Sequence, residues 1–420
     1  MKILHASHLY YPSLGGNQVH NKELSEALVR HGDDVSVFTS NARNLSQLER
    51  FDPQFIPLSK KEVVNGVRIR RYSPHYGVHS FVFGKLGKIR GGHKLRELFL
   101  KAAYEMWAHG PCIPQMLLDI YRKKPDIVMA VNNYHTTTYL CYLANKYFKI
   151  PLVMTPAFHT QDEWAQSPII YKMLESADLI ICLTEYEKRF LLEKGLNEQK
   201  LVVIGVGVDC EKFFVSDANK FRKQFSIADA PVVGYVGRHV MGKGINTLVN
   251  AMPQVWEHIP NAKLVLAGHK DERFREVLEK KKVSMGGMYR KNVIEFDEIS
   301  EDRKKDILAA SDVFAMPSNT DSFGIVYLEA WASGTPVIAC RDTPQETLIN
   351  HGQDGLLVGY GDEKELAASI IKLLQDTNAR ASMGRLGRQK VQNNYRWDII
   401  ASRIREEYQK ILESNNSCRN

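Results

Sequence analysis

Two carboxylates stand eight positions apart in residues 320–339, which read TDSFGIVYLEAWASGTPVIA. Asp321 precedes a Ser-Phe-Gly loop, and Glu329 lies about one turn inside the helix that the pattern predicts over 325–332. Gly324 lets the backbone approach a ligand closely, and the first amides of a helix point at ligand oxygens. Because a carboxylate can accept two hydrogen bonds from a vicinal diol, the stretch predicts a site for a hydroxyl-rich ligand such as a ribose.

A second group of polar residues follows the strand predicted at 232–236, in the loop GRHVMGKG at 237–244. Arg238 and Lys243 supply two cations from one glycine-containing loop. A guanidinium offers a planar fork and an ammonium a point charge, and both suit a diphosphate. The loop has neither the Walker A spacing nor the GxGxxG pattern, so it matches no standard phosphate motif.

Each of these features also has a structural explanation that the residues alone leave open. The loop at 237–244 could be a surface turn with solvated bases. Asp321 could be an ordinary acid at the start of a helix, and Glu329 a solvated helix position, although its neighbours are apolar. The stretch that follows is read as mainly structural, with Gly334 ending the helix and Pro336 beginning the next strand.

The elements that must position these residues form two series of alternating strands and helices. A chain of 420 residues is expected to form two domains, and the patterns divide it near residue 205. Ligands of parallel sheets bind beyond the carboxyl ends of the strands, so a cleft between the domains is the expected site. The first series has predicted strands at 3–6, 35–39, 127–131, 152–155 and 179–183, with a helix at 18–31. The second has predicted strands at 232–236, 263–267, 293–296, 313–316 and 337–339, and a helix at 397–413 ends the chain.

The composition is that of a globular protein with an uneven charge. The chain is 44% apolar and 25% charged, and its net charge is +8. Residues 1–205 hold 26 basic and 19 acidic residues, a difference of 26 − 19 = +7, so the first half carries almost the whole excess. The six scattered cysteines predict neither a zinc site nor a disulfide framework and favour a reducing cytoplasm. No signal peptide or membrane-spanning helix is expected.

The basic first half predicts a negatively charged partner, which could be nucleic acid, an anionic membrane or a phosphorylated acceptor. Between residues 80 and 107, basic residues alternate with leucines and aromatic side chains. Such a segment suits an anionic membrane surface, although a solvated helix face is the alternative. Nucleic acid is not expected as a partner, because no nucleic-acid-binding motif accompanies the charge.

Five motifs together resemble those of the retaining glycosyltransferases of family 4, and the resemblance covers nearly the whole chain. In chain order they are Gly15-Gly16 after the first strand, GR…KG at 237–244, DVFxxPS at 312–318, the acid-x7-Glu pair at 321–329 and GTPVIA at 334–339. The resemblance implies an α/β fold of the GT-B type, with two Rossmann-like parallel-sheet domains facing across a cleft. Residues 1–205, with a helix at about 397–415 crossing back, would bind the acceptor, and 206–396 the nucleotide-sugar donor.

The resemblance also implies roles for charged residues. Arg238 and Lys243 are expected to neutralise the diphosphate leaving group, which is the main electrostatic contribution in a site without metal. No DxD triplet occurs, in keeping with metal independence, and no cofactor is expected. Glu329 is expected to bind the ribose. His159, which follows a strand, resembles the family's histidine near the anomeric carbon, although a histidine there is often structural.

The remaining expected contacts hold the sugar. Asp321 and the backbone amides of Phe323, Gly324 and Ile325 are expected to bind hydroxyls of the transferred sugar, and Gly16 is assigned to the donor site. The family usually has Glu where this chain has Asp321, one methylene shorter, so the preferred sugar is the property most affected. Front-face attack with retention is carried over from the family.

The function that follows is transfer of a hexosyl unit from a UDP- or GDP-sugar to a lipid-linked or glycan acceptor, in envelope or capsule polysaccharide or glycolipid synthesis. The expected location is the cytoplasm, with contact to the cytoplasmic face of a membrane. Two other kinds of protein stay open. One is a GT-B-type nucleotide-sugar epimerase or a phosphorylase, and the other is a non-catalytic sugar-nucleotide-binding protein at a membrane surface.

Overall fold

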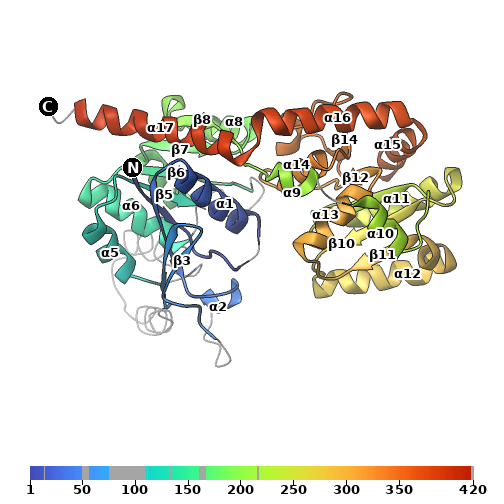
Figure 1. Cartoon of the computed structure of the whole chain (residues 1–420), viewed down its shortest axis with the longest axis horizontal. Helices are drawn as coiled ribbons and strands as arrows, with labels where there is room; N and C mark the ends of the chain where they lie inside the picture. Colours follow the sequence, from blue (N-terminus) through green and yellow to red (C-terminus); the bar gives the residue numbers. More distant parts are fainter. Residues whose placement is uncertain are drawn as a thin grey trace, which may run out of the picture. The chain divides into compact units, whose positions relative to one another are not determined.

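The structure is a computed structural model, and the chain divides into two compact units (Figure 1). The first comprises Met1–Gly207 and Trp397–Asn420, and the second Val208–Arg396. The described residues are 1–13, 15–49, 56–74, 110, 112–131, 135–159, 167–214 and 217–417. The segment 80–107, which the sequence assigns to a membrane surface, lies outside them.

The first unit is built on an eight-stranded sheet in the order β3-β4-β2-β1-β5-β6-β7-β8. Neighbouring strands are parallel, except that β3 runs antiparallel to β4. The central strands are apolar and buried along their length, as expected for a parallel sheet covered on both faces. The strands are β1 (Lys2–Ala6), β2 (Asp34–Ser40), β3 (Lys61–Val64), β4 (Val67–Tyr72), β5 (Ile127–Val131), β6 (Leu152–Thr155), β7 (Leu179–Cys182) and β8 (Leu201–Val203).

The hairpin of β3 and β4 was not predicted from the sequence. Asn65 and Gly66 join the two strands, and both have positive φ angles, 48° and 82°. An Asn-Gly pair between strands is a strong hairpin signal, because both central residues of this tight turn need positive φ. The signal was therefore present, but β3 is mostly exposed and lacks the apolar run that identifies the predicted strands. The buried strand β14 was not predicted either.

The last helix of the chain packs on α1 of the first unit, as Figure 1 shows. Asp33 helps to fix it, because its buried carboxylate accepts from the amino terminus of Met1 at 2.8 Å and from Arg405 Nε at 2.9 Å. Tyr408 is fully buried beside Met129 of β5. The helices of this unit are α1 (Gly16–Arg30), α2 (Ser46–Glu49), α5 (Gln115–Lys123), α6 (Thr136–Phe148), α7 (Pro168–Ser176), α8 (Glu185–Glu193) and α17 (Trp397–Ser417), with a 3₁₀ turn at Glu198–Lys200.

The second unit is a six-stranded, fully parallel sheet in the order β11-β10-β9-β12-β13-β14. Its first strand, β9, therefore pairs with β10 on one side and β12 on the other. This is the doubly wound order, in which the carboxyl ends of β9 and β12 form the switch point that binds ligands. The strands are β9 (Val232–Val236), β10 (Lys263–Ala267), β11 (Val293–Phe296), β12 (Val313–Ala315), β13 (Val337–Cys340) and β14 (Gly355–Val358).

Helix α14 has the bounds that the sequence predicts, Ile325–Ala332. It ends at Gly334, whose φ is 82° and whose N–H donates to Trp331 O at 2.8 Å. Thr335 N–H donates to Ala330 O at 2.9 Å, which completes a Schellman motif and confirms the structural reading of this stretch. The other helices are α9 (Cys210–Phe214), α10 (Ala218–Gln224), α11 (Ile245–His258), α12 (Glu272–Asn292), α13 (Glu301–Ala310), α15 (Glu363–Gln375) and α16 (Thr377–Asn394), with a 3₁₀ turn at Pro344–Thr347. Within the described residues, no helix is long and apolar enough to span a bilayer.

Candidate functional site

The loops that follow β9 and β12 pack directly against each other at the switch point of the second unit. Gly242 and Gly244 have positive φ angles of 87° and 71°. A Cβ on Gly244 would lie 2.1 Å from the carbonyl oxygen of Pro317, and one on Gly242 would lie 2.4 Å from the Thr320 side chain. Asn319 N–H donates to Gly242 O at 2.9 Å. Glycine is needed at both positions because any side chain would separate the two loops.

An ion pair joins the same loops through the two residues that the sequence singled out. Lys243 Nζ donates to Asp321 Oδ1, and their side chains are only 12% and 14% exposed. The second carboxylate oxygen, Asp321 Oδ2, is buried and has no hydrogen-bond partner among the described residues. A buried oxygen without a donor is costly, so Oδ2 is the atom of this pair that a ligand hydroxyl would satisfy.

Arg238 is the other cation of the loop, and its side chain pairs with no acid in the described part of the chain. Its main chain is fixed, because the hydroxyl of buried Tyr235 donates to Arg238 O at 3.0 Å. Burial raises the pKa of Tyr235, and the nearby charge of Asp321 adds to the effect, so the phenol stays neutral and keeps its proton for this bond.

The start of α14 lies in the loop that carries Asp321. Phe323 is buried against the ring of Tyr395, with centroids 6.1 Å apart, and its carbonyl accepts from Gln345 Nε2 at 3.0 Å. Gly324 is the N-cap with φ 88°, and no side chain caps the helix. The first amides of α14, from Ile325 onward, therefore have no side-chain acceptor, as a binding site for ligand oxygens requires.

Glu329 is not the solvated residue that one alternative predicted, because α14 buries it. Its Oε1 accepts from Lys304 Nζ of α13 at 2.6 Å, and Lys304 also lies 3.0 Å from Glu301 Oε2. Burial lowers the pKa of Lys304, but the two glutamates outweigh it and the net shift is upward, so the ammonium stays charged. Lys304 was not found from the sequence, since its only local partner is Glu301 and Glu329 lies 25 positions away.

His239 is a second residue that the sequence did not single out. It lies between the two cations of the loop and is fully buried, with the rings of Tyr235 and Phe274 at 5.6 and 6.2 Å. Burial lowers its pKa to about 4, and the charge of Lys270 contributes. The imidazole is therefore neutral at pH 7 and acts as a packing residue of the loop.

The other two predicted residues lie in the first unit, apart in the chain from the seven of the second. Gly16 is the first residue of α1, which has no side-chain cap. His159 lies four residues after β6, at the carboxyl edge of the sheet, and is partly exposed. Its Nδ1 is buried and has no hydrogen-bond partner among the described residues.

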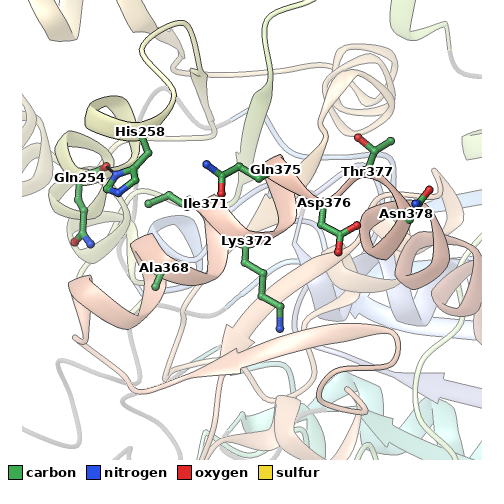
Figure 2. A pocket seen from close by; sticks show the side chains of 9 residues that line it. All are labelled: Gln254, His258, Ala368, Ile371, Lys372, Gln375, Asp376, Thr377 and Asn378. Atoms are coloured by element: carbon green, nitrogen blue, oxygen red, sulfur yellow. Dashed lines mark hydrogen bonds between the residues drawn. The ribbon is translucent and has the colours of Figure 1, made fainter.

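A hollow of about 790 Å³ lies away from this site, between α11, α15 and the start of α16 (Figure 2). Gln254 and His258 of α11 line one side of it, and Ile371 and Gln375 of α15 line the other. These are the carboxyl-terminal halves of the two helices, so the hollow lies at the amino edge of the sheet. The ligand-binding edge of a doubly wound sheet is the opposite one.

Comparison with known families decides the identity. The profile of "Glycosyltransferase Family 4" matches residues 14–212, and that of "Glycosyl transferases group 1" matches residues 216–390. The two matches together span both units. The chain belongs to glycosyltransferase family 4.

Relatives of this family 4 chain include a sulfoquinovosyl transferase and a mannosyltransferase. It is 28% identical over 313 residues to the sulfoquinovosyl transferase SQD2 of Arabidopsis thaliana, covering 70% of this chain and 58% of that protein. It is 28% identical over 254 residues to the GDP-mannose-dependent alpha-(1-6)-phosphatidylinositol monomannoside mannosyltransferase of Mycobacterium tuberculosis, covering 57% of this chain and 65% of that protein. The chain thus matches about three fifths of the length of these relatives.

The fold is shared with solved glycosyltransferase structures. The Anabaena protein Alr3699/HepE, in complex with UDP and glucose, superimposes with a TM-score of 0.73 at 20% identity, over 98% of this chain and 100% of that one. The family and the predicted pair of Rossmann-like parallel-sheet units are therefore confirmed. The roles assigned to the nine site residues stay predictions, which the geometry above makes specific.

Replacing His239 with Leu is expected to reduce the acid sensitivity of the protein. The pKa of this histidine falls from its ordinary value of 6.5 to about 4 on folding, so between these values the unfolded chain binds more protons. The stability that depends on neutral His239 is therefore fully present above pH 6.5 and is lost as the pH falls towards 4. Melting temperatures measured from pH 7 to pH 4 should fall less steeply for His239→Leu than for the wild type. Equal slopes would contradict the prediction.

Replacing Lys304 with Met is expected to destabilise the second unit by about 3 kcal/mol, because Glu329 is then buried without its cation. Urea denaturation followed by tryptophan fluorescence measures the loss. Lys305→Met is the matched control on the same helix, since Lys305 pairs with the exposed Asp302. The control should leave the denaturation midpoint near that of the wild type. A similar midpoint shift in both variants would show that the buried pair contributes no more to stability than the exposed pair.

Proposed function

We propose that this family 4 chain is a retaining, metal-independent glycosyltransferase that moves a hexosyl unit from a UDP- or GDP-sugar to a lipid-linked or glycan acceptor. The observation that carries the proposal is the cluster at the switch point of the second unit. Lys243 and Asp321 are paired there, Arg238 has no acidic partner among the described residues, and α14 begins without a side-chain cap. Cations beside unpaired amides suit a diphosphate, and an unsatisfied carboxylate oxygen suits a sugar hydroxyl.

The charged residues of the site have separate proposed roles. Arg238 and Lys243 stabilise the negative charge that develops on the departing diphosphate, which is the main electrostatic contribution to such a reaction. Asp321 gives one oxygen to Lys243 and has Oδ2 for the sugar. Glu329 gives Oε1 to Lys304 and has its other oxygen for a ribose hydroxyl. His159 of the first unit is assigned to the anomeric carbon by the family resemblance.

Support for the donor and acceptor comes from the relatives. The mycobacterial relative is named for GDP-mannose, whereas the Anabaena structure holds UDP, so both nucleotides stay in the proposal. The mycobacterial relative is named for a phosphatidylinositol monomannoside, which supports a lipid-linked acceptor at the cytoplasmic face of a membrane. The basic residues of 80–107 would contact the anionic lipids of that membrane.

The donor can be identified by thermal shift, because a ligand that binds only the folded protein raises its melting temperature. We expect one UDP- or GDP-sugar to give the largest shift in a panel of donors. Lys243→Ala and Glu329→Ala should each reduce that shift and lower transfer at least about tenfold while the protein stays folded, since each loses about one charged hydrogen bond to the donor. Lys305→Ala is the surface control and should match the wild type.

The outcomes of this experiment separate the alternatives. Wild-type turnover in both Lys243→Ala and Glu329→Ala would contradict the proposed site. Donor binding without release of nucleoside diphosphate to any acceptor would favour a non-catalytic binding protein. Conversion of the donor without an acceptor would indicate an epimerase, and the absorbance of bound pyridoxal phosphate a phosphorylase.

The stereochemistry and metal requirement are tested on the same reaction. We expect transfer to proceed at the same rate in EDTA, because Arg238 and Lys243 neutralise the leaving group. Proton NMR of the first product formed should show the anomeric configuration of the donor. A rate that falls in EDTA and returns with Mg²⁺ or Mn²⁺ would overturn metal independence, and an inverted product would overturn retention.

A further inference from the structure

His159 sits at the end of a short segment whose backbone is held in an uncommon conformation. Ala157 has a φ of 51°, in the left-handed region that residues other than glycine rarely adopt. Such a conformation persists only where the surrounding structure enforces it. Phe158 supplies part of that support, because its buried ring packs on Phe190 at 5.7 Å and on Tyr171 at 6.4 Å.

A buried carboxylate supplies the rest. Glu187 of α8 accepts from Phe158 N–H at 2.7 Å through Oε1 and from Leu183 N–H at 2.6 Å through Oε2. The residue is 2% exposed. One side chain therefore holds the Ala157–Phe158 peptide, one residue before His159, against the end of β7. It connects the carboxyl ends of two neighbouring strands, β6 and β7, at the ligand-binding edge of this sheet.

The capping of α8 does not explain this arrangement. Thr184 is the N-cap, and its hydroxyl accepts from Glu187 N–H at 3.1 Å. In a capping box, a Glu at this third position reaches back to the N–H of the cap residue itself. Here its two oxygens bind Leu183, one residue before the cap, and Phe158 on another strand. The carboxylate thus binds the segment that leads to His159, whereas Thr184 alone caps the helix.

The burial of this carboxylate is unfavourable for the fold by itself. Desolvation raises the pKa of Glu187 to about 7, although the two N–H donors act in the opposite direction. Glutamine would fill the same space without a buried charge, but it offers one acceptor oxygen where two N–H groups need one each. The second oxygen is the reason for a glutamate at this place.

We propose that Glu187 is a positioning residue for glycosyl transfer, which fixes the Phe158 peptide and through it the direction of His159. The inference rests on the proposed function, in which His159 acts at the anomeric carbon. Glu187 itself is buried and does not touch the substrate. Its loss is expected to slow the chemical step without weakening donor binding, because the seven predicted donor-binding residues at the switch point are in the other unit.

Glu187→Gln tests the proposal in the full chain. The assay is release of nucleoside diphosphate from UDP-glucose and GDP-mannose with water as acceptor, which needs no knowledge of the natural acceptor. We expect kcat to fall about 10- to 100-fold, as for a misplaced catalytic group, while KM for the donor stays within about twofold of the wild type. A kcat equal to that of the wild type would overturn the proposal.

Two control variants separate positioning from stability. Thr184→Val removes the helix cap and should lower the melting temperature by about 2–4 °C. It keeps both carboxylate bonds and should keep kcat. Glu185→Gln changes an exposed acid two positions away and should change neither quantity. If kcat falls as far in Thr184→Val as in Glu187→Gln, loss of stability explains the effect and the proposal is wrong.

A double-mutant cycle shows whether Glu187 acts through His159. In a His159→Ala background, Glu187→Gln should cause no further loss of kcat, because the residue that it positions is gone. Independent, multiplying losses would overturn the inference while leaving the proposed function in place. Failure of the wild type to release nucleoside diphosphate from any UDP- or GDP-sugar of the thermal-shift panel, UDP-glucose and GDP-mannose included, would overturn the function and this inference together.

Discussion

The ion pair between Lys243 and Asp321 is the contact on which the candidate donor site depends. It joins a loop after the first strand of the second sheet to a loop after the fourth, 78 positions away. The two loops meet only because β9 and β12 are neighbours, and Gly242 and Gly244 remove the side chains that would hold them apart. The pair then holds the acid proposed to bind the sugar and the cation proposed to bind the phosphate at a fixed separation, as a preorganised site requires.

Both acids of residues 321–329 form an ion pair with a lysine. Each acid of the acid-x7-Glu pair has a lysine from a different element, Lys243 for Asp321 and Lys304 for Glu329. A buried carboxylate without a cation would tend to take up a proton, and a protonated acid is a poorer acceptor for sugar hydroxyls. Because these two lysines are offset by the acids, Arg238 is the cation of this cluster that has no acidic partner among the described residues. In the proposed function, Arg238 is therefore the cation whose charge is most available to the diphosphate.

At the carboxyl edge of the first sheet several buried histidines are neutral, whereas the site in the second unit pairs its buried acids with lysines. Burial lowers the pKa of His5 to about 3 and that of His20 to about 4. His8 stacks on His135 with ring centroids 3.6 Å apart, and burial lowers the pKa of His8 as well. Glu187 is the acid in this group, and its carboxylate bonds to two backbone amides. The excess of basic residues in this half of the sequence is therefore not needed to balance charge inside this edge.

The sequence by itself predicted most of the strands and the residues that are proposed for the site. The apolar runs of β5, β6, β9 and β10 and the bounds of α14 follow from local periodicity and stop signals, which a linear pattern contains. The strand β3 was missed because it is mostly exposed, so its sequence shows no alternation of apolar and polar residues. The tertiary structure alone decided the partners of the acids and the support of His159. The contacts of Lys304 with Glu329, of Glu187 with Phe158 and of Lys243 with Asp321 join residues 25, 29 and 78 positions apart. The order of the strands in each sheet brings these residues together. No periodic pattern in the sequence indicates contacts at such separations.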